Sequence, residues 1–165
     1  MPAPLRSMLF VPADSERKLD KARQSAADAL ILDLEDSVAP ARKPLARGAA
    51  ASYIGAQAGA LAAQLYVRIN PLDSGLALHD LAAVVVPGLA GILLPKPSGA
   101  DDVRRLSLYL DALEARAGMA AGSVFLRSSP PLRCALRAPR AEFPSMTAYS
   151  KLRATSWRHV LPTLV

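Results

Sequence analysis

The chain has 165 residues, of which 52% are hydrophobic and 21% are charged. It is long enough to bury the core of a single domain and too hydrophobic to be disordered. Its longest apolar stretch, residues 81–95, is interrupted by Pro87, Gly88 and Gly91 and is shorter than the roughly 20 residues of a membrane-spanning helix. A single cysteine, Cys134, excludes an intrachain disulfide. We therefore expect a cytoplasmic protein that lacks a secretory signal and a membrane anchor.

The formal net charge of +6 is unevenly distributed. Residues 1–125 contain 13 basic and 13 acidic residues, whereas residues 126–165 contain 7 basic residues and one acid, Glu142. All the excess charge therefore lies in a segment with many prolines and serines, which we expect to be an irregular basic tail. Such a tail could bind phosphates. Its aromatic residues do not alternate with basic ones as in a nucleic-acid stacking surface, so we do not expect a nucleic-acid partner.

Hydrophobic periodicity predicts strands that alternate with helices over the first 125 residues. In chain order we expect a strand over 7–11, a helix over 16–26, a strand over 29–34, a helix over 43–63, a strand over 65–69, a helix over 75–86, a strand over 91–94, a helix over 100–116 and the start of a strand over 123–126. Asp14 or Ser15 could cap the first helix. We expect Leu45, Ala49, Tyr53 and Leu61 near the buried face of the second helix, and Leu78, Leu81 and Val85 on that of the third.

Strands that are apolar on both faces are typical of a parallel sheet covered by helices, either an open doubly wound sheet or a (β/α)₈ barrel. The first strand is not followed by a glycine-rich nucleotide-binding motif. Instead, unusual residues follow successive strands: Pro12, Glu35, Asp36, Arg68, Asn70 and Lys96. Because chemistry collects at strand ends in (β/α)₈ barrels, we predict an α/β fold in which residues 1–125 form the first half of such a barrel, about four βα units, followed by the tail of residues 126–165.

Three kinds of side chain at these strand ends could carry chemistry. Asp33, Glu35 and Asp36 form an acidic cluster that could serve a metal or transfer protons, or could be surface charges and a helix cap. Arg68 lies in an apolar strand, where it could bind a carboxylate or thioester oxygen or form a salt bridge with Glu35 or Asp36. Lys96, between two prolines, is either a solvent-exposed turn residue, a cation for a negative substrate or a Schiff-base lysine.

Several segments of this part of the chain form a recognisable set: RSMLFVP over 6–12, AADALILDLEDSVAP over 26–40, Lys43 with Ala46 and Arg47, VRIN over 67–70 and LLPK over 93–96. Together, over about residues 5–125, they resemble the citrate lyase β-subunit and malyl-CoA lyase family of the HpcH/HpaI aldolase group. The resemblance implies a (β/α)₈ barrel that makes or breaks a carbon–carbon bond beside a CoA thioester. It also implies Mg²⁺ as the Lewis acid that stabilises an enolate, and a homo-oligomer for full-length members.

The resemblance also implies roles for individual residues. Arg68 corresponds to the arginine that binds the substrate's oxygens, and the acidic cluster surrounds the site and positions Arg68. Arg17 and Lys21 match basic residues near the acyl-CoA entrance, and Lys96 is a further candidate for an acyl-CoA contact. Ala13 stands where the family usually has glycine.

The resemblance ends near residue 126, where the charge also changes. In the family, a glutamate after the fifth strand and an aspartate after the sixth hold the metal. Residues 127–165 contain one carboxylate, Glu142, in surroundings that do not match. We therefore expect the metal ligands to be absent from this chain, and we hypothesise that a frameshift joins half a barrel to unrelated sequence.

Two functions are consistent with these residues and with the resemblance. The first is a magnesium-dependent carbon–carbon lyase acting on a citryl-CoA or malyl-CoA type of thioester, inactive as this chain. The second is a non-catalytic fragment that associates with a full-length relative. A half barrel exposes unpaired sheet edges, so we also expect poor solubility.

Overall fold

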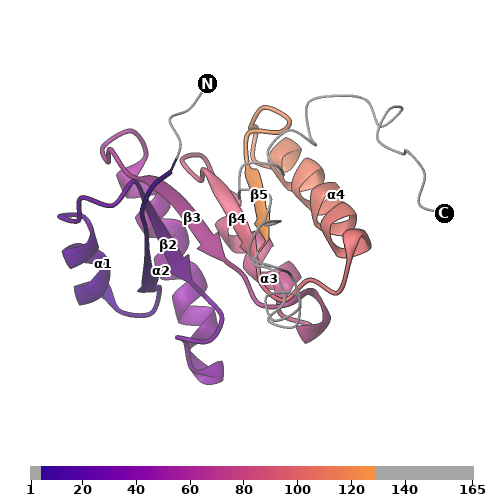
Figure 1. The fold of residues 1–165 in the computed structure, drawn as a ribbon, viewed down its shortest axis with the longest axis horizontal. Helices are drawn as coiled ribbons and strands as arrows, with labels where there is room; N and C mark the ends of the chain where they lie inside the picture. The colour runs from indigo at the N-terminus through magenta and orange to yellow at the C-terminus, as the bar shows by residue number, and fades with distance from the viewer. Residues whose placement is uncertain (1–4, 129–165) are drawn as a thin grey trace, which may run out of the picture.

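The computed structural model describes residues 5–128, which form one parallel sheet and the helices that connect its strands (Figure 1). The strands lie side by side in chain order: β1 (Met8–Pro12), β2 (Ala29–Asp33), β3 (Gln64–Arg68), β4 (Gly91–Leu94) and β5 (Phe125–Ser128). The connections contain α1 (Glu16–Ala22), η1 (Pro40–Arg42), α2 (Lys43–Gln57), η2 (Leu72–Ser74), α3 (Ala77–Val84) and α4 (Ala100–Arg116). The predicted parallel α/β architecture is confirmed. Of the expected tail over 126–165, residues 129–165 lie outside the described residues, and β5 continues to Ser128.

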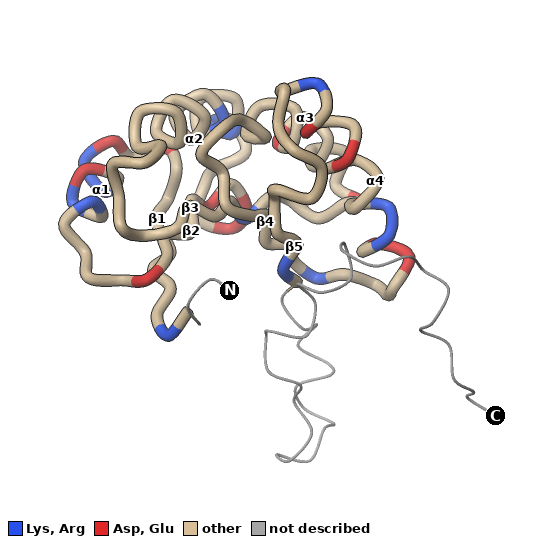
Figure 2. The backbone as a smooth tube through the Cα atoms, turned by 90° about the horizontal axis from the view of Figure 1, so that it is seen from above, with Lys and Arg blue, Asp and Glu red and all other residues tan. Residues whose placement is uncertain are grey.

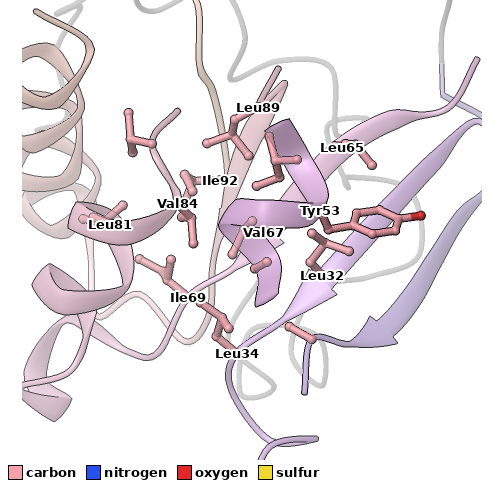
Figure 3. Close-up of a cluster of buried hydrophobic side chains, with 14 of the residues drawn as sticks. Leu32, Leu34, Tyr53, Leu65, Val67, Ile69, Leu81, Val84, Leu89 and Ile92 are labelled. Carbon is pink, nitrogen blue, oxygen red and sulfur yellow. The ribbon is translucent and has the colours of Figure 1, made fainter. Parts of the chain in front are cut away.

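The four α-helices follow one side of the row of strands (Figure 2). Alternate strand residues point to that side and form the larger core with residues of the helices. Figure 3 shows part of this core, in which Leu32, Leu34, Val67, Ile69 and Ile92 of the sheet region lie close to Tyr53, Leu81 and Val84 of the helices. Burying each large aliphatic side chain contributes ~1.5–3 kcal/mol, so this layer is the main source of stability. None of the described helices is both long and apolar enough to cross a membrane.

The opposite side of the sheet, here called the helix-free face, carries a smaller buried cluster that includes Ile31, Tyr66 and Leu93. Gly91 is required for its packing. A Cβ atom at Gly91 would lie 2.4 Å from Cε1 of Tyr66 and 2.6 Å from the carbonyl oxygen of Phe125. The Tyr66 ring therefore covers the glycine at the start of β4, an arrangement that gives that strand a packed face without a side chain of its own.

Three helices end earlier than expected, α3 by two residues, at Val84, and the first two by more. Helix α1 ends at Ala22 instead of residue 26, and α2 ends at Gln57 instead of residue 63. After α2 the backbone turns out of the helical region at Ala58 (ψ 115°) and into the left-handed region at Gly59 (φ 74°). Alanine favours helix wherever it stands, so the alanine-rich composition of residues 43–63 extends the second predicted helix too far.

Of the positions expected to be buried in the second and third helical segments, Tyr53, Leu81 and Val85 are buried, but two others are exposed. Leu45 and Leu78 are 57% and 54% exposed. The side chain of Arg47 on α2 instead reaches the fully buried Asp80 on α3, with Nε 2.7 Å from Oδ1. The Arg47–Asp80 pair thus lies between α2 and α3, an interface for which the hydrophobic pattern predicts apolar side chains.

The expected cap of the first helix is confirmed in its position but not in its hydrogen bond. Ser15 is the N-cap residue of α1, but its side chain makes no capping hydrogen bond. The Asp14 carboxylate accepts a hydrogen bond from Nε of Arg42 at 2.6 Å, and the Asp14 carbonyl accepts one from Nη2 at 2.9 Å. Asp14 therefore joins the loop after β1 to η1.

Candidate functional site

Strand register brings the candidate residues together at the carboxyl ends of the strands. Asp33 on β2 is paired with Arg68 on β3, and Arg68 is paired with Leu93 on β4. The alternation of side chains turns Asp33 and Arg68 toward the helix-free face. The residues that meet there are Asp33, Glu35, Asp36, Arg68 and Lys96, which we call the strand-end cluster.

A two-point ion pair between Arg68 and Asp33 forms the centre of this cluster. Nε of Arg68 donates to Oδ1 at 2.8 Å, and Nη2 donates to Oδ2 at 2.6 Å. Asp33 also accepts hydrogen bonds from the Glu35 amide at 2.9 Å and from the amide and hydroxyl of Ser37, the amide at 3.1 Å. This geometry fixes the plane of the guanidinium and its direction.

The titration of these two groups reflects the pairing. Burial alone would raise the pKa of Asp33, but the hydrogen bonds from Arg68, Ser37 and the Glu35 amide outweigh burial and lower it. The hydrogen bond to Asp33 is the main reason that the pKa of Arg68 is raised. Both groups therefore stay ionised over the physiological pH range.

Glu35 bridges two cations with its two carboxylate oxygens. Oε2 lies 3.1 Å from Nη1 of Arg68, and Oε1 lies 2.9 Å from Nζ of Lys96. The carboxylate is only 5% exposed, and within residues 5–128 neither oxygen is aligned for a hydrogen bond. Its contacts are therefore ionic. Asp36 completes the cluster from a more exposed position, 3.6 Å from Lys96 and 3.9 Å from Arg68.

Lys96 reaches Glu35 from an unusual backbone conformation. Its φ of 46° makes it the one non-glycine residue in the left-handed region among residues 5–128. For a residue with a Cβ atom this conformation costs ~1–2 kcal/mol. The carboxylate of Glu35 is the main cause that raises the pKa of Lys96. Lys96 is thus neither a simple solvent-exposed turn residue nor a free cation: its side chain is 65% exposed, yet its ammonium is paired.

A second set of polar residues, which sequence reasoning did not identify as a unit, lies buried next to the cluster. The Lys43 ammonium, at the first position of α2, donates to the carbonyls of Leu34 (2.8 Å) and Glu35 (2.9 Å) and to Oδ1 of Asn70 (2.8 Å). Asn70 in turn donates its backbone and side-chain N–H groups to Oδ2 of Asp80, at 2.8 and 2.7 Å. We call Lys43, Arg47, Asn70 and Asp80 the buried network.

The sequence contained signals for this network. A lysine at a helix N-terminus opposes the helix dipole, so Lys43 needs a specific partner to be stable there. Asp80 stands in the otherwise apolar segment 76–86, apart from His79. Charges complement each other between the two sets: the cluster carries three carboxylates and two cations, whereas the network carries one carboxylate and two cations. Together they are formally neutral.

Arg68 lies at the centre of the cluster and stays partly exposed. Two of its N–H groups are hydrogen-bonded to Asp33, and the guanidinium carries five in all. Its Nη1 atom also lies 3.1 Å from Glu35 and 3.9 Å from Asp36. Its carbon Cζ lies 4.8 Å from the centre of the Phe10 ring, and 21% of its side chain is exposed. The guanidinium is therefore oriented by Asp33 and reachable in part from the strand ends.

Arg17 and Lys21 are not part of this cluster. Both lie on α1, the helix after β1, with exposed side chains, and neither forms an ion pair within the described part of the chain. Glu142 and Cys134 lie outside the described residues.

The sequence model of the HpcH/HpaI aldolase/citrate lyase family matches residues 6–128. The chain belongs to this family. It is 37% identical over 124 residues to the citrate lyase subunit beta of Haemophilus influenzae, a match that covers 72% of this chain and 40% of that protein. It is 38% identical over 104 residues to a (3S)-malyl-CoA thioesterase of Cereibacter sphaeroides, covering 63% of this chain and 36% of that one. The chain therefore spans about two fifths of the length of these curated relatives.

The chain is also similar to solved structures, one of them from the same family. The citrate lyase beta subunit from M. tuberculosis, complexed with oxaloacetate and magnesium, is 31% identical with a TM-score of 0.54, covering 73% of this chain and 56% of that one. Malate synthase from Haloferax volcanii, in a pyruvate/acetyl-CoA complex, has a TM-score of 0.70 at 19% identity, covering 77% of this chain and 39% of that one. The second similarity shows a shared fold alone.

The described residues of this family member do not fit a bound Mg²⁺. Residues 5–128 contain no group of three or more His, Cys, Asp or Glu side chains that could hold a metal ion. Asp33, Glu35 and Asp36 are all engaged by Arg68 or Lys96, which neutralise the charge that a divalent cation would require. In this part of the chain the three carboxylates are therefore held by two cations and are not arranged as a set of metal ligands.

Proposed function

We propose that the chain carries the substrate-binding half of a carbon–carbon lyase site that acts on a CoA thioester of the citryl-CoA or malyl-CoA type. The observation that carries the proposal is the partly exposed Arg68 guanidinium, which Asp33 holds at two points and whose other N–H groups make ionic contacts only. The names of the relatives, a citrate lyase subunit beta and a (3S)-malyl-CoA thioesterase, support the substrate class. The parallel strand order β1 to β5, with helices along one side, supports the first part of a (β/α)₈ barrel.

In this proposal each residue has a distinct task. Arg68 binds the carboxylate or thioester oxygen of the substrate, and Asp33 sets the direction of its N–H groups. Glu35 and Asp36 support Arg68 by charge. Arg17 and Lys21 on α1 remain candidates for contacts with the phosphates of CoA because both are exposed cations.

We also propose that the described residues bind the substrate without completing the catalytic site. In the family reaction Mg²⁺ would act as a Lewis acid, and its ligands would have to come from outside residues 5–128. A lack of turnover by this chain would agree with that arrangement.

The test is the set of products formed by the full chain with malyl-CoA or citryl-CoA in the presence of MgCl₂. Cleavage of the carbon–carbon bond releases acetyl-CoA together with glyoxylate or oxaloacetate. Hydrolysis of the thioester releases free CoA together with malate or citrate. Chromatography of the CoA species separates the two reactions, and the second would favour the thioesterase activity named for the Cereibacter relative.

Binding is measured separately, by calorimetry with oxaloacetate. Arg68→Met is expected to weaken binding by about ten- to a hundredfold, the loss of one charge-assisted contact. Arg104→Met is the matched control because Arg104 forms an exposed ion pair with Asp101 on α4, at 2.8 Å. Equal affinities of Arg68→Met and the wild-type chain would refute the assignment of Arg68.

The second candidate function is a non-catalytic fragment that associates with a full-length relative. The lack of a metal-holding group in the described residues favours it. It predicts a folded chain that gives no product with either thioester and that co-elutes with a citrate lyase subunit beta in size-exclusion chromatography. Product formation by the purified chain would exclude it.

A further inference from the structure

We propose that Lys96 is a positioning residue that acts on Arg68 through Glu35. This inference deepens the proposed function, because it concerns the side chain that orients the anion-binding guanidinium. Lys96 and Arg68 share one carboxylate: each holds a different oxygen of Glu35, at 2.9 and 3.1 Å. The charge that Glu35 directs at Arg68 therefore depends on Lys96.

The main chain of Glu35 is held from the other side, so a change in its charge balance acts on the position of its carboxylate. Its amide donates to Asp33 at 2.9 Å, and its carbonyl accepts a hydrogen bond from the buried ammonium of Lys43 at 2.9 Å. The carboxylate is 5% exposed, so solvent does not replace a lost partner easily. If Lys96 loses its charge, the Glu35 carboxylate has Arg68 as its remaining close cation.

The backbone of Lys96 supports the same role. The left-handed conformation at φ 46° lies between Pro95 and Pro97, whose rings restrict the chain on both sides. A strained backbone persists where the surrounding structure holds it, and such positions are concentrated at functional sites. Here the conformation brings the side chain of Lys96, just after β4, to the carboxylate of Glu35, just after β2. The contact crosses over β3, the strand that carries Arg68.

The rate at which a reagent modifies the Arg68 guanidinium measures the effect of Lys96 on Arg68, and it does so without any substrate. Phenylglyoxal modifies arginine, and mass spectrometry of the peptide that contains Arg68 gives the rate of modification at this residue in the full chain. In Lys96→Met the Glu35 carboxylate is drawn to Arg68 alone, so we expect modification to slow by about threefold, equivalent to ~0.7 kcal/mol. Lys96→Arg keeps the cation and is expected to restore the wild-type rate.

A double-mutant cycle separates action through Glu35 from a direct effect on Arg68. Glu35→Gln removes the shared charge and should accelerate modification of Arg68. In that background, adding Lys96→Met should change the rate no further. Persistence of the full threefold effect in Glu35→Gln would overturn the proposal, as would a Lys96→Met rate equal to that of the wild type.

Two further measurements separate positioning from a general loss of structure. The thermal midpoint of Lys96→Met is compared with that of Arg104→Met, which removes an ion pair exposed on both sides, and should lie below it because Glu35 is only 5% exposed. A lowered midpoint without a change at Arg68 would show a merely structural role. Oxaloacetate calorimetry tests the proposed function on its own: if Arg68→Met binds as the wild type does, that function fails, while the modification rates still decide the role of Lys96.

Discussion

The exchange of Asp33 for asparagine tests whether the bidentate ion pair stabilises the fold as well as the site. Asp33 is 1% exposed and accepts hydrogen bonds from Arg68, Ser37 and the Glu35 amide. Asparagine preserves the shape but removes the charge and turns an NH₂ group toward a donor. Removing one partner of a buried ion pair costs ~3–5 kcal/mol, and because Arg68 is partly exposed and keeps Glu35, we expect a loss of ~2–3 kcal/mol at neutral pH.

The pH dependence of this loss follows from the direction of the pKa shift. The pKa of Asp33 is lower in the folded chain than in the unfolded chain. Its contribution to stability is therefore complete above the unfolded value, about 4, and disappears as the pH falls through the folded value. The difference in unfolding free energy between the wild type and Asp33→Asn should accordingly decrease as the solution is acidified below about pH 4.

Urea unfolding followed by far-ultraviolet circular dichroism measures the loss at each pH. Asp28→Asn is the matched control at the opposite end of the same strand. Asp28 accepts hydrogen bonds from the amides of Arg6 (2.8 Å) and Ser7 (2.9 Å), and the contact with Arg6 is the main cause that lowers its pKa to about 2. Because Arg6 is 83% exposed, the control should lose less stability. Equal losses at Asp33 and Asp28, or a loss at Asp33 that does not change with pH, would refute the reasoning.

Three other substitutions test separate parts of the fold, each by the same urea titration. Gly91→Ala should cost ~1–3 kcal/mol because its Cβ would overlap the buried ring of Tyr66, and an unchanged midpoint would contradict the packing of the helix-free face. Lys43→Met should cost ~1–3 kcal/mol because it leaves three oxygen acceptors without their ammonium donor. A more stable variant would show that the cost of desolvating Lys43 outweighs its hydrogen bonds. The two carboxylate oxygens of Glu114 accept hydrogen bonds from the amides of Gly122 (2.7 Å) and Val124 (2.8 Å). Glu114→Gln should cost ~1–3 kcal/mol because a glutamine side chain has only one acceptor oxygen. Wild-type stability of this variant would exclude a role for Glu114 in the turn before β5.

The strands were predictable because their burial on both faces leaves a continuous apolar pattern. The segment over residues 91–94 was expected as a strand and is β4, and the strand expected over 29–34 is β2. The acidic cluster and Arg68 were also expected near one another, because parallel strands end at one edge of the sheet. The ion pair with Asp33 as the principal partner was not expected, since alternation along β2 gives the face of a side chain and not its distance to a neighbour on β3.

The exposure of Leu45 on α2 and of Leu78 on α3 was not predicted from periodicity for a different reason. Asp80 and Arg47 occupy an interface that a hydropathy pattern reserves for apolar residues, so the pattern assigned these two leucines to it as well. Lys43 stands out in the sequence only as part of a motif. Its three acceptors come from residues 34, 35 and 70, and sequence spacing does not show that these converge.

The strand-end cluster draws its members from neighbouring strands, which has a consequence for the division of labour in the site. Asp33 lies on β2, Arg68 on β3 and Lys96 just beyond β4, and β3 pairs with both of the other strands. The two hydrogen bonds from Arg68 to Asp33 are made within residues 5–128. The proposed anion-binding group is thus formed by this part of the chain, whereas the metal chemistry proposed for the family reaction requires ligands that this part does not provide. Anion binding and turnover should therefore be separable in this chain, with oxaloacetate affinity present even where no acetyl-CoA is released.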